Sequence, residues 1–204
     1  MTRVTWKKGT VISIEAREDI CFLAQMMEEP YLYFFDIYND SHEWKISSLE
    51  NTNTLFCVPV VHKFLKDSHV KKMDIVGNST LQFPSRWIQR NFESQMYTIW
   101  EGTDDEMTFA MSKPGGVLVE RTLTTKPQDF IVIKEINNNE DSIIDSHELT
   151  SLRTYPELNE RLYLSYLFGK NVDPLKDIMF QRTMKKEYKV YMQIFTGKYK
   201  GLYK

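Results

Sequence analysis

The side chains that could do chemistry are scattered along this chain. His62 and His69 stand seven residues apart, a spacing that fits no common zinc pattern, and no Cys-x-x-Cys pair accompanies them. Cys57 and His62 could form a thiol nucleophile with its base, but their odd separation on one strand points the two side chains to opposite faces. Motifs of hydrolases, P-loop NTPases and dinucleotide-binding enzymes are absent. The sequence therefore predicts a protein without catalytic residues, metal ligands or cofactors.

Short runs of carboxylates could also serve as the acid pair of a glycosidase or a nuclease. They occur at Glu28-Glu29 and at Asp104-Asp105-Glu106. Acids in turns are ordinarily solvated, and nothing around these runs predicts a raised pKa. A cryptic enzyme is a rival hypothesis, with a pocket lined by His62, Asp36 and the aromatic residues 31–38. Without catalysis, His62 is expected to have a structural role under the sheet.

Residues 137–148 resemble a calcium-binding loop in part. Their oxygen-bearing side chains fall at several ligand positions of such a loop, with an apolar residue between them. Asn137 stands where that loop has a carboxylate, and Ser142 stands where it has glycine. The same residues fit a solvated loop that leads into a helix with Asp145 and Glu148 as its capping box. Both interpretations stay open from the sequence.

The net charge of −2 conceals an uneven distribution. Residues 1–92 hold 11 basic and 11 acidic side chains, residues 93–160 hold 5 and 14, and residues 161–204 hold 10 and 3. Such segregation indicates either that the acidic and basic segments pack on one another or that one of them meets a charged partner. The basic segment interleaves lysines with tyrosines, which suits either nucleic-acid binding by charge and stacking or a solvated helix face and tail.

The N-terminal part of the chain consists of short apolar runs that are rich in β-branched and aromatic residues and bounded by Gly, Asn, Pro or charge. Strands are predicted at residues 11–15, 20–26, 31–38, 55–62, 73–76, 97–101, 107–111, 117–122 and 130–136. The turn at residues 113–116 predicts that the strands on either side of it pair as a hairpin. A short helix is predicted over residues 85–92, between the strand at 73–76 and the strand at 97–101.

Helices are predicted to gather after residue 145. One begins at the Asp145 capping box, and a second begins at Pro156 and ends at Gly169. A third starts at Asp173-Pro174 and runs to about Met184. Residues 188–195 could be a strand or more helix. Strands followed by helices predict segregated layers rather than alternating units.

The predicted fold class is therefore α+β, with a mostly antiparallel N-terminal sheet and helices concentrated in the C-terminal third. A chain of 204 residues fits a single domain, with a sheet region at 1–92, an acidic hairpin region at 93–145 and a helical, basic region at 146–204. No apolar leader and no membrane-length apolar run occurs, and the two cysteines are expected as buried thiols, so a bacterial cytoplasm is expected. The predicted core includes Phe34, Ile37, Phe56, Val58 and Val60.

Four segments of the N-terminal part carry a resemblance to a known family. They are Trp6-Lys-Lys-Gly-Thr10, Phe34-Phe-Asp36, Phe56-Cys-Val-Pro-Val-Val-His62 and Ile75-Val-Gly-Asn78. Their types and order resemble the immunity protein 26 family of bacterial polymorphic toxin systems over about residues 5–90. Thr10 departs from the aspartate of that family, and Met73 departs from its tryptophan.

The resemblance implies an immunity protein that neutralises a cognate toxin domain by stoichiometric binding and is not an enzyme. Toxin domains that attack nucleic acid present positive charge, so an acidic stretch would favour association. The predicted partner-binding residues are Glu101, Asp104, Asp105 and Glu106. The same acids also fit a solvated link or charges neutralised by the basic C-terminal segment. A nucleic-acid-binding module is the alternative function, and no membrane partner is expected.

Overall fold

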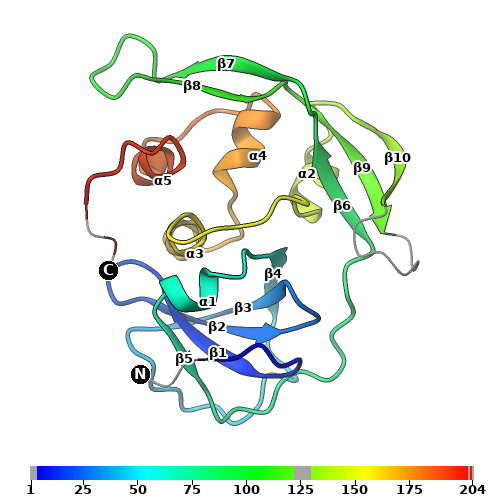
Figure 1. Ribbon diagram of the computed structural model, residues 1–204, viewed down its shortest axis with the longest axis vertical. Helices are drawn as coiled ribbons and strands as arrows, with labels where there is room; N and C mark the ends of the chain where they lie inside the picture. The colour runs from blue at the N-terminus through cyan, green and yellow to red at the C-terminus, as the bar shows by residue number, and fades with distance from the viewer. Residues whose placement is uncertain (1–3, 122–129, 202, 204) are drawn as a thin grey trace. The chain divides into compact units, whose positions relative to one another are not determined.

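The computed structural model describes residues 4–121, 130–201 and 203, which form two compact units. Unit 1 comprises Met1–Gln82, Leu152–Val172 and Gln193–Lys204, and unit 2 comprises Phe83–Ser151 and Asp173–Met192. The fold class is α+β, with an antiparallel N-terminal sheet and helices mostly in the C-terminal third, as the sequence predicts (Figure 1). The three predicted regions do not coincide with the units, because the residues after 146 divide between both. The single domain stays a prediction.

Unit 1 is built on a five-stranded sheet in the order β4-β3-β2-β1-β5, in which every pair of neighbours is antiparallel. The strands are β1 (Val11–Glu15), β2 (Cys21–Met26), β3 (Tyr31–Asn39), β4 (Thr54–Pro59) and β5 (Val70–Lys72). Two helices belong to this unit, α1 (Phe64–Asp67) and α3 (Glu157–Phe168). Gly169 ends α3 with a positive φ of 61°, a conformation that glycine adopts without strain.

Apolar side chains cover both faces of this sheet, because alternate residues of a strand point to opposite sides. In β1, Ile12 and Ile14 join a cluster with Leu158 and Leu162 of α3. Val11 points to the other face and joins a second cluster with Leu49. Four of the predicted core residues are buried and the fifth, Ile37, packs half-buried against the second cluster; the buried ones are Phe34, Phe56, Val58 and Val60.

Unit 2 contains a three-stranded sheet in the order β10-β9-β6 and a two-stranded β7-β8 hairpin. The strands are β6 (Arg86–Arg90), β7 (Ser94–Ile99), β8 (Met107–Ser112), β9 (Gly116–Arg121) and β10 (Phe130–Ile136). The helices are α2 (Asp141–Ser146), α4 (Pro174–Met179), a 3-10 turn η1 (Lys186–Tyr188) and the first residues of α5 (Lys189–Phe195). The Asp173 side chain caps α4 by accepting from the backbone N–H of Leu175. No described helix is both long and apolar enough to cross a bilayer.

Several sequence predictions are wrong in this region. The helix predicted at 85–92 is β6, because its residues find backbone partners in β9, with Trp87 opposite Val119. The hairpin predicted across residues 113–116 does not form, since β8 pairs with β7 and β9 pairs with β6 and β10.

The starts and ends of other elements also differ. Residues 73–76 are not a strand, and their side chains Met73 and Ile75 pack on the second cluster of unit 1. The helix predicted to begin at Asp145 does not form, because α2 begins at Asp141 without a side-chain cap and ends at Ser146. Helix α4 ends at Met179, and residues 189–195 are helical.

Candidate partner-binding site

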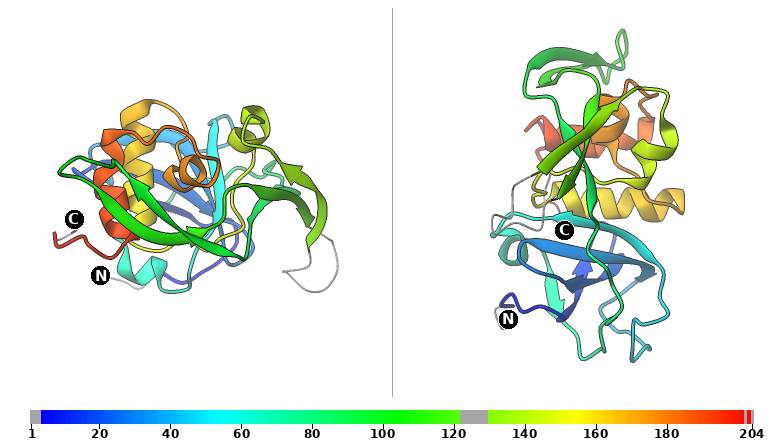
Figure 2. Two further views of the ribbon diagram at one scale, coloured as in Figure 1. Left: turned by 90° about the horizontal axis from the view of Figure 1, so that it is seen from above. Right: turned by 90° about the vertical axis from the view of Figure 1, so that its right-hand side faces the viewer.

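The connection between β7 and β8 carries the predicted acidic residues, as a hairpin tip of residues 100–106 (Figure 2). Trp100 and Gly102 have positive φ values of 50° and 74°, which reverse the chain within a few residues. The backbone N–H of Gly102 donates to Glu106 Oε2 at 2.8 Å, and the Thr103 hydroxyl donates to the Trp100 carbonyl at 2.7 Å. The tip is therefore fixed by its own hydrogen bonds.

The four predicted residues differ in what they contact. Asp105 is half-buried, and its Oδ1 lies 2.5 Å from Nζ of Lys189 in α5. Glu101, Asp104 and Glu106 are exposed and form no ion pair with a cation in residues 4–121, 130–201 and 203. The tip thus presents three carboxylates to solvent, while the fourth anchors it to α5.

Other acids of unit 2 pair with basic side chains of α4 and of the segment between α4 and η1. Arg182 contacts Asp141 and Asp145 and lies 3.6 Å from Asp177, while Lys176 lies 3.4 Å from Glu148. These contacts correspond to the first interpretation of the charge distribution, in which the acidic and basic segments pack on one another. The exposed tip is one part of the acidic segment that this pairing leaves open.

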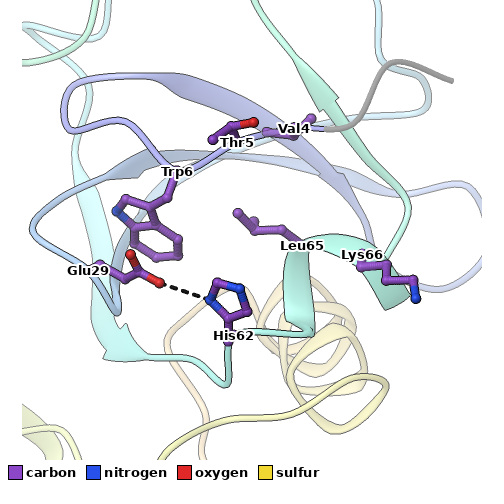
Figure 3. Close-up of a pocket in the computed structure, with 7 residues that line it drawn as sticks. All are labelled: Val4, Thr5, Trp6, Glu29, His62, Leu65 and Lys66. Atoms are coloured by element: carbon purple, nitrogen blue, oxygen red, sulfur yellow. Dashed lines mark hydrogen bonds and ion pairs between the residues drawn. The ribbon is translucent and has the colours of Figure 1, made fainter.

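A second candidate site is a hollow of about 280 Å³ in unit 1 (Figure 3). His62 Nδ1 lies 3.0 Å from Glu29 Oε1 at its mouth, and Trp6 and Leu65 form its wall. A carboxylate bonded to one ring nitrogen orients an imidazole and leaves the other nitrogen for a ligand proton. The lining includes the Thr5 hydroxyl but no cysteine. The hollow therefore lacks the nucleophile that a Cys–His pair would need.

The expected role of His62 under the sheet is wrong, because its side chain is 83% exposed. Asp36 does not line the hollow, so the pocket of the cryptic-enzyme hypothesis is not assembled as predicted. Cys57 is buried and unbridged, as is Cys21, whose pKa burial raises to about 12. Such a thiol is protonated at neutral pH and is a poor nucleophile.

A protein family described as "Domain of unknown function (DUF8309)" matches residues 1–184, which include both the acidic tip and the hollow. The chain belongs to this family. No curated protein and no solved structure matches the chain.

The calcium-like segment of this DUF8309 chain uses its polar groups internally. The backbone N–H and the side-chain amide of Asn137 both donate to Glu140 Oε2, and Asp141 and Asp145 contact Arg182. Within the described residues, no three His, Cys, Asp or Glu side chains are grouped so that they could hold a metal ion. These residues act here as contacts between the β10–α2 segment and Arg182.

The basic, Tyr-rich C-terminal segment also makes intramolecular contacts. Tyr188 and Tyr191 are fully buried, so neither ring is open for stacking on a base. The Tyr188 hydroxyl donates to Asp177 Oδ2 at 2.8 Å, and burial raises the pKa of both groups. The sequence indicates that the basic C-terminal segment could neutralise the acidic one. It does not indicate which residues pair, because nothing local links Lys189 to Asp105.

Proposed function

We propose that this DUF8309 protein is an immunity protein, which binds a cognate bacterial toxin domain in the cytoplasm and neutralises it stoichiometrically. The observation that carries the proposal is the hairpin tip, where Glu101, Asp104 and Glu106 are exposed and form no ion pair within the described residues. Binding needs such a preformed surface and no chemistry of the inhibitor itself.

The geometry suits recognition of a basic surface. The tip is closed by the Gly102–Glu106 hydrogen bond and joined to α5 through Asp105 and Lys189, so its carboxylates are held in place before a partner arrives. Preorganised charge raises association rates and disfavours partners of the wrong sign. A toxin domain that cleaves nucleic acid has the required positive surface, because it must attract phosphates.

The test uses the purified toxin domain encoded beside the gene of this protein. Association is measured by stopped-flow fluorescence at low and high salt, and protection is measured as survival of cells that express the toxin. Reversal of two exposed charges in Glu101→Lys/Asp104→Lys should slow association about 10- to 100-fold at low salt, and by less at high salt where charges are screened. Asp105 and Glu106 are kept, because their loss would break the contact with Lys189 and the hydrogen bond that closes the tip.

The matched control reverses two exposed acids of unit 1, Glu43→Lys/Asp74→Lys. Both variants change the net charge equally, so only a local effect separates them. Wild-type association by the tip variant would place the interface elsewhere and refute the tip as the binding site. Absence of a neighbouring toxin, or failure of the wild-type protein to bind and protect against it, would refute the immunity function.

A further inference from the structure

A carboxyl group is buried beneath the C-terminal tail of unit 1, here defined as residues 196–201 and 203. Glu160 of α3 is fully buried. Its Oε2 accepts a hydrogen bond from the Tyr203 hydroxyl at 3.2 Å and lies 3.5 Å from Nε of Arg17. Its Oε1 is buried as well and has no hydrogen-bond partner in the described part of the chain. A half-satisfied buried carboxylate is costly when it is ionised.

The same tyrosine holds the tail on unit 1. The Tyr155 hydroxyl donates to the Tyr203 carbonyl at 2.8 Å, and the two rings meet edge to face with centroids 5.9 Å apart. The Tyr199 ring lies 6.4 Å from the Tyr203 ring. Tyr203 is therefore held on unit 1 through its hydroxyl and its backbone carbonyl, and its ring contacts Tyr199 of the tail.

The charged and titratable groups around Glu160 come from each element packed on it. Arg17 and Glu18 belong to the β1–β2 connection, Tyr163 to α3 and Tyr203 to the tail. The Arg17 guanidinium lies 4.0 Å over the Tyr163 ring, whose hydroxyl donates to Glu18 at 2.9 Å.

Burial raises the pKa of Glu160 from 4.5 to about 7. The charge of Arg17 and the hydrogen bond from Tyr203 lower the pKa, and the charge of Glu18 raises it. The Glu160 carboxyl group therefore gains or loses its proton near neutral pH.

We propose that Glu160 is a proton-operated latch for the C-terminal tail. The protonated carboxyl stays buried under Tyr203 and keeps the tail docked, whereas the ionised carboxylate gains solvation when the tail lifts. This device is independent of the toxin-binding function and of the hairpin tip. Its effect is to make access to the half-buried Tyr199 depend on pH.

The direction follows from proton linkage. The docked state has the raised pKa of about 7, and a solvated glutamate has a pKa near 4.5. The docked state therefore binds more protons between these values, so docking is strongest at acid pH and weakens as the pH rises to about 7. The full separation of the two pKa values corresponds to a factor on the order of 100 in the docking equilibrium.

The latch is tested by hydrogen–deuterium exchange of the tail amides, corrected for intrinsic exchange, at about pH 5 and about pH 8. In the wild-type protein, protection should fall on the order of 100-fold between these conditions. Glu160→Gln cannot ionise, so its tail should stay protected at both pH values. Tyr203→Phe lacks the hydroxyl on Glu160, which should alter tail protection most at the higher pH. Glu28→Gln removes an exposed acid and should behave as wild type.

Tail protection that does not change with pH in the wild type, or a pH dependence that survives in Glu160→Gln, would overturn the latch. Carbon-13 titration of the Glu160 carboxyl in the wild-type protein gives an independent measure. A midpoint near neutral pH supports the latch, and a midpoint at the ordinary glutamate value refutes it even if Glu160→Gln fails to fold.

Discussion

Ion pairs occur within both units, and in unit 2 several acids gather around one cation, Arg182. In unit 1, apolar clusters cover both faces of one five-stranded sheet and include residues from β1, β2, β3 and α3. Unit 2 has buried apolar residues such as Trp87 and Val119, but its basic side chains Arg182 and Lys189 also pair with acids from α2 and the hairpin tip. The stabilisation from apolar burial depends little on ionic strength, whereas salt screens the attraction of surface charge pairs. The two units should therefore respond differently to mutation and to ionic strength.

The largest effect is expected in the apolar core of unit 1. Phe56 is 5% exposed, and its ring centroid lies 5.0 Å from that of Phe34. Phe56→Ala removes a buried ring and leaves a cavity, which should lower the free energy of unfolding by about 3–5 kcal/mol. The measurement is urea denaturation. Phe92→Ala is the control, because Phe92 is 92% exposed and its loss should change stability by less than about 0.5 kcal/mol. Equal effects of both changes would contradict the assigned core.

A smaller effect is expected from the central cation of unit 2. The Arg182 side chain is 21% exposed and contacts Asp141, Asp145 and Asp177. Asp141 and Asp145 are themselves mostly exposed, so solvent screens part of the attraction. Arg182→Gln should cost about 1–2 kcal/mol at low salt and less at high salt.

The control for that change is Arg86→Gln, whose side chain is 53% exposed and pairs with Glu120 at 3.7 Å. Its cost should be no more than about 0.5 kcal/mol. An Arg182→Gln cost that does not change with ionic strength would show that the arginine acts by packing alone, and would remove the distinction between the units.

The smallest effect is expected at the hairpin tip. Lys189 and Asp105 are 47% and 44% exposed, so their ion pair should contribute about 0.2–1 kcal/mol. A double-mutant cycle with Asp105→Asn and Lys189→Gln isolates this coupling in urea denaturation. Zero coupling would mean that the tip is held by its internal hydrogen bonds alone.

The sequence predicts unit 1 better than unit 2 for a physical reason. Strand β1 is predicted to the residue, because a short run rich in β-branched residues, bounded by Gly9-Thr10 and by charged residues, indicates a strand locally. The end of helix α3 is also predicted from the sequence, because Gly169 terminates it. Strand β6 was predicted as a helix, since residues 85–92 show no alternation and become a strand only through pairing with β9.

The acidic residues are predicted to link two strands, and they do connect β7 and β8, while their role in binding stays a prediction. Lys189 is 84 residues from its partner Asp105 in the chain, so no local pattern could identify the contact. The Tyr203–Glu160 contact was missed for the same reason, and a glutamate in an amphipathic helix gives no local sign that it is buried. The Glu29–His62 pair likewise joins residues that only the fold brings together.

The order of the segments along the chain affects how the protein is made. Unit 1 takes its sheet from Met1–Gln82 but receives α3 only after most of unit 2 has been synthesised. On the ribosome, the face of the nascent sheet that later meets Leu158 and Leu162 is therefore without its helix while more than seventy residues emerge. An exposed apolar face is a site for aggregation and for chaperones. No single cut of the chain would release both units intact.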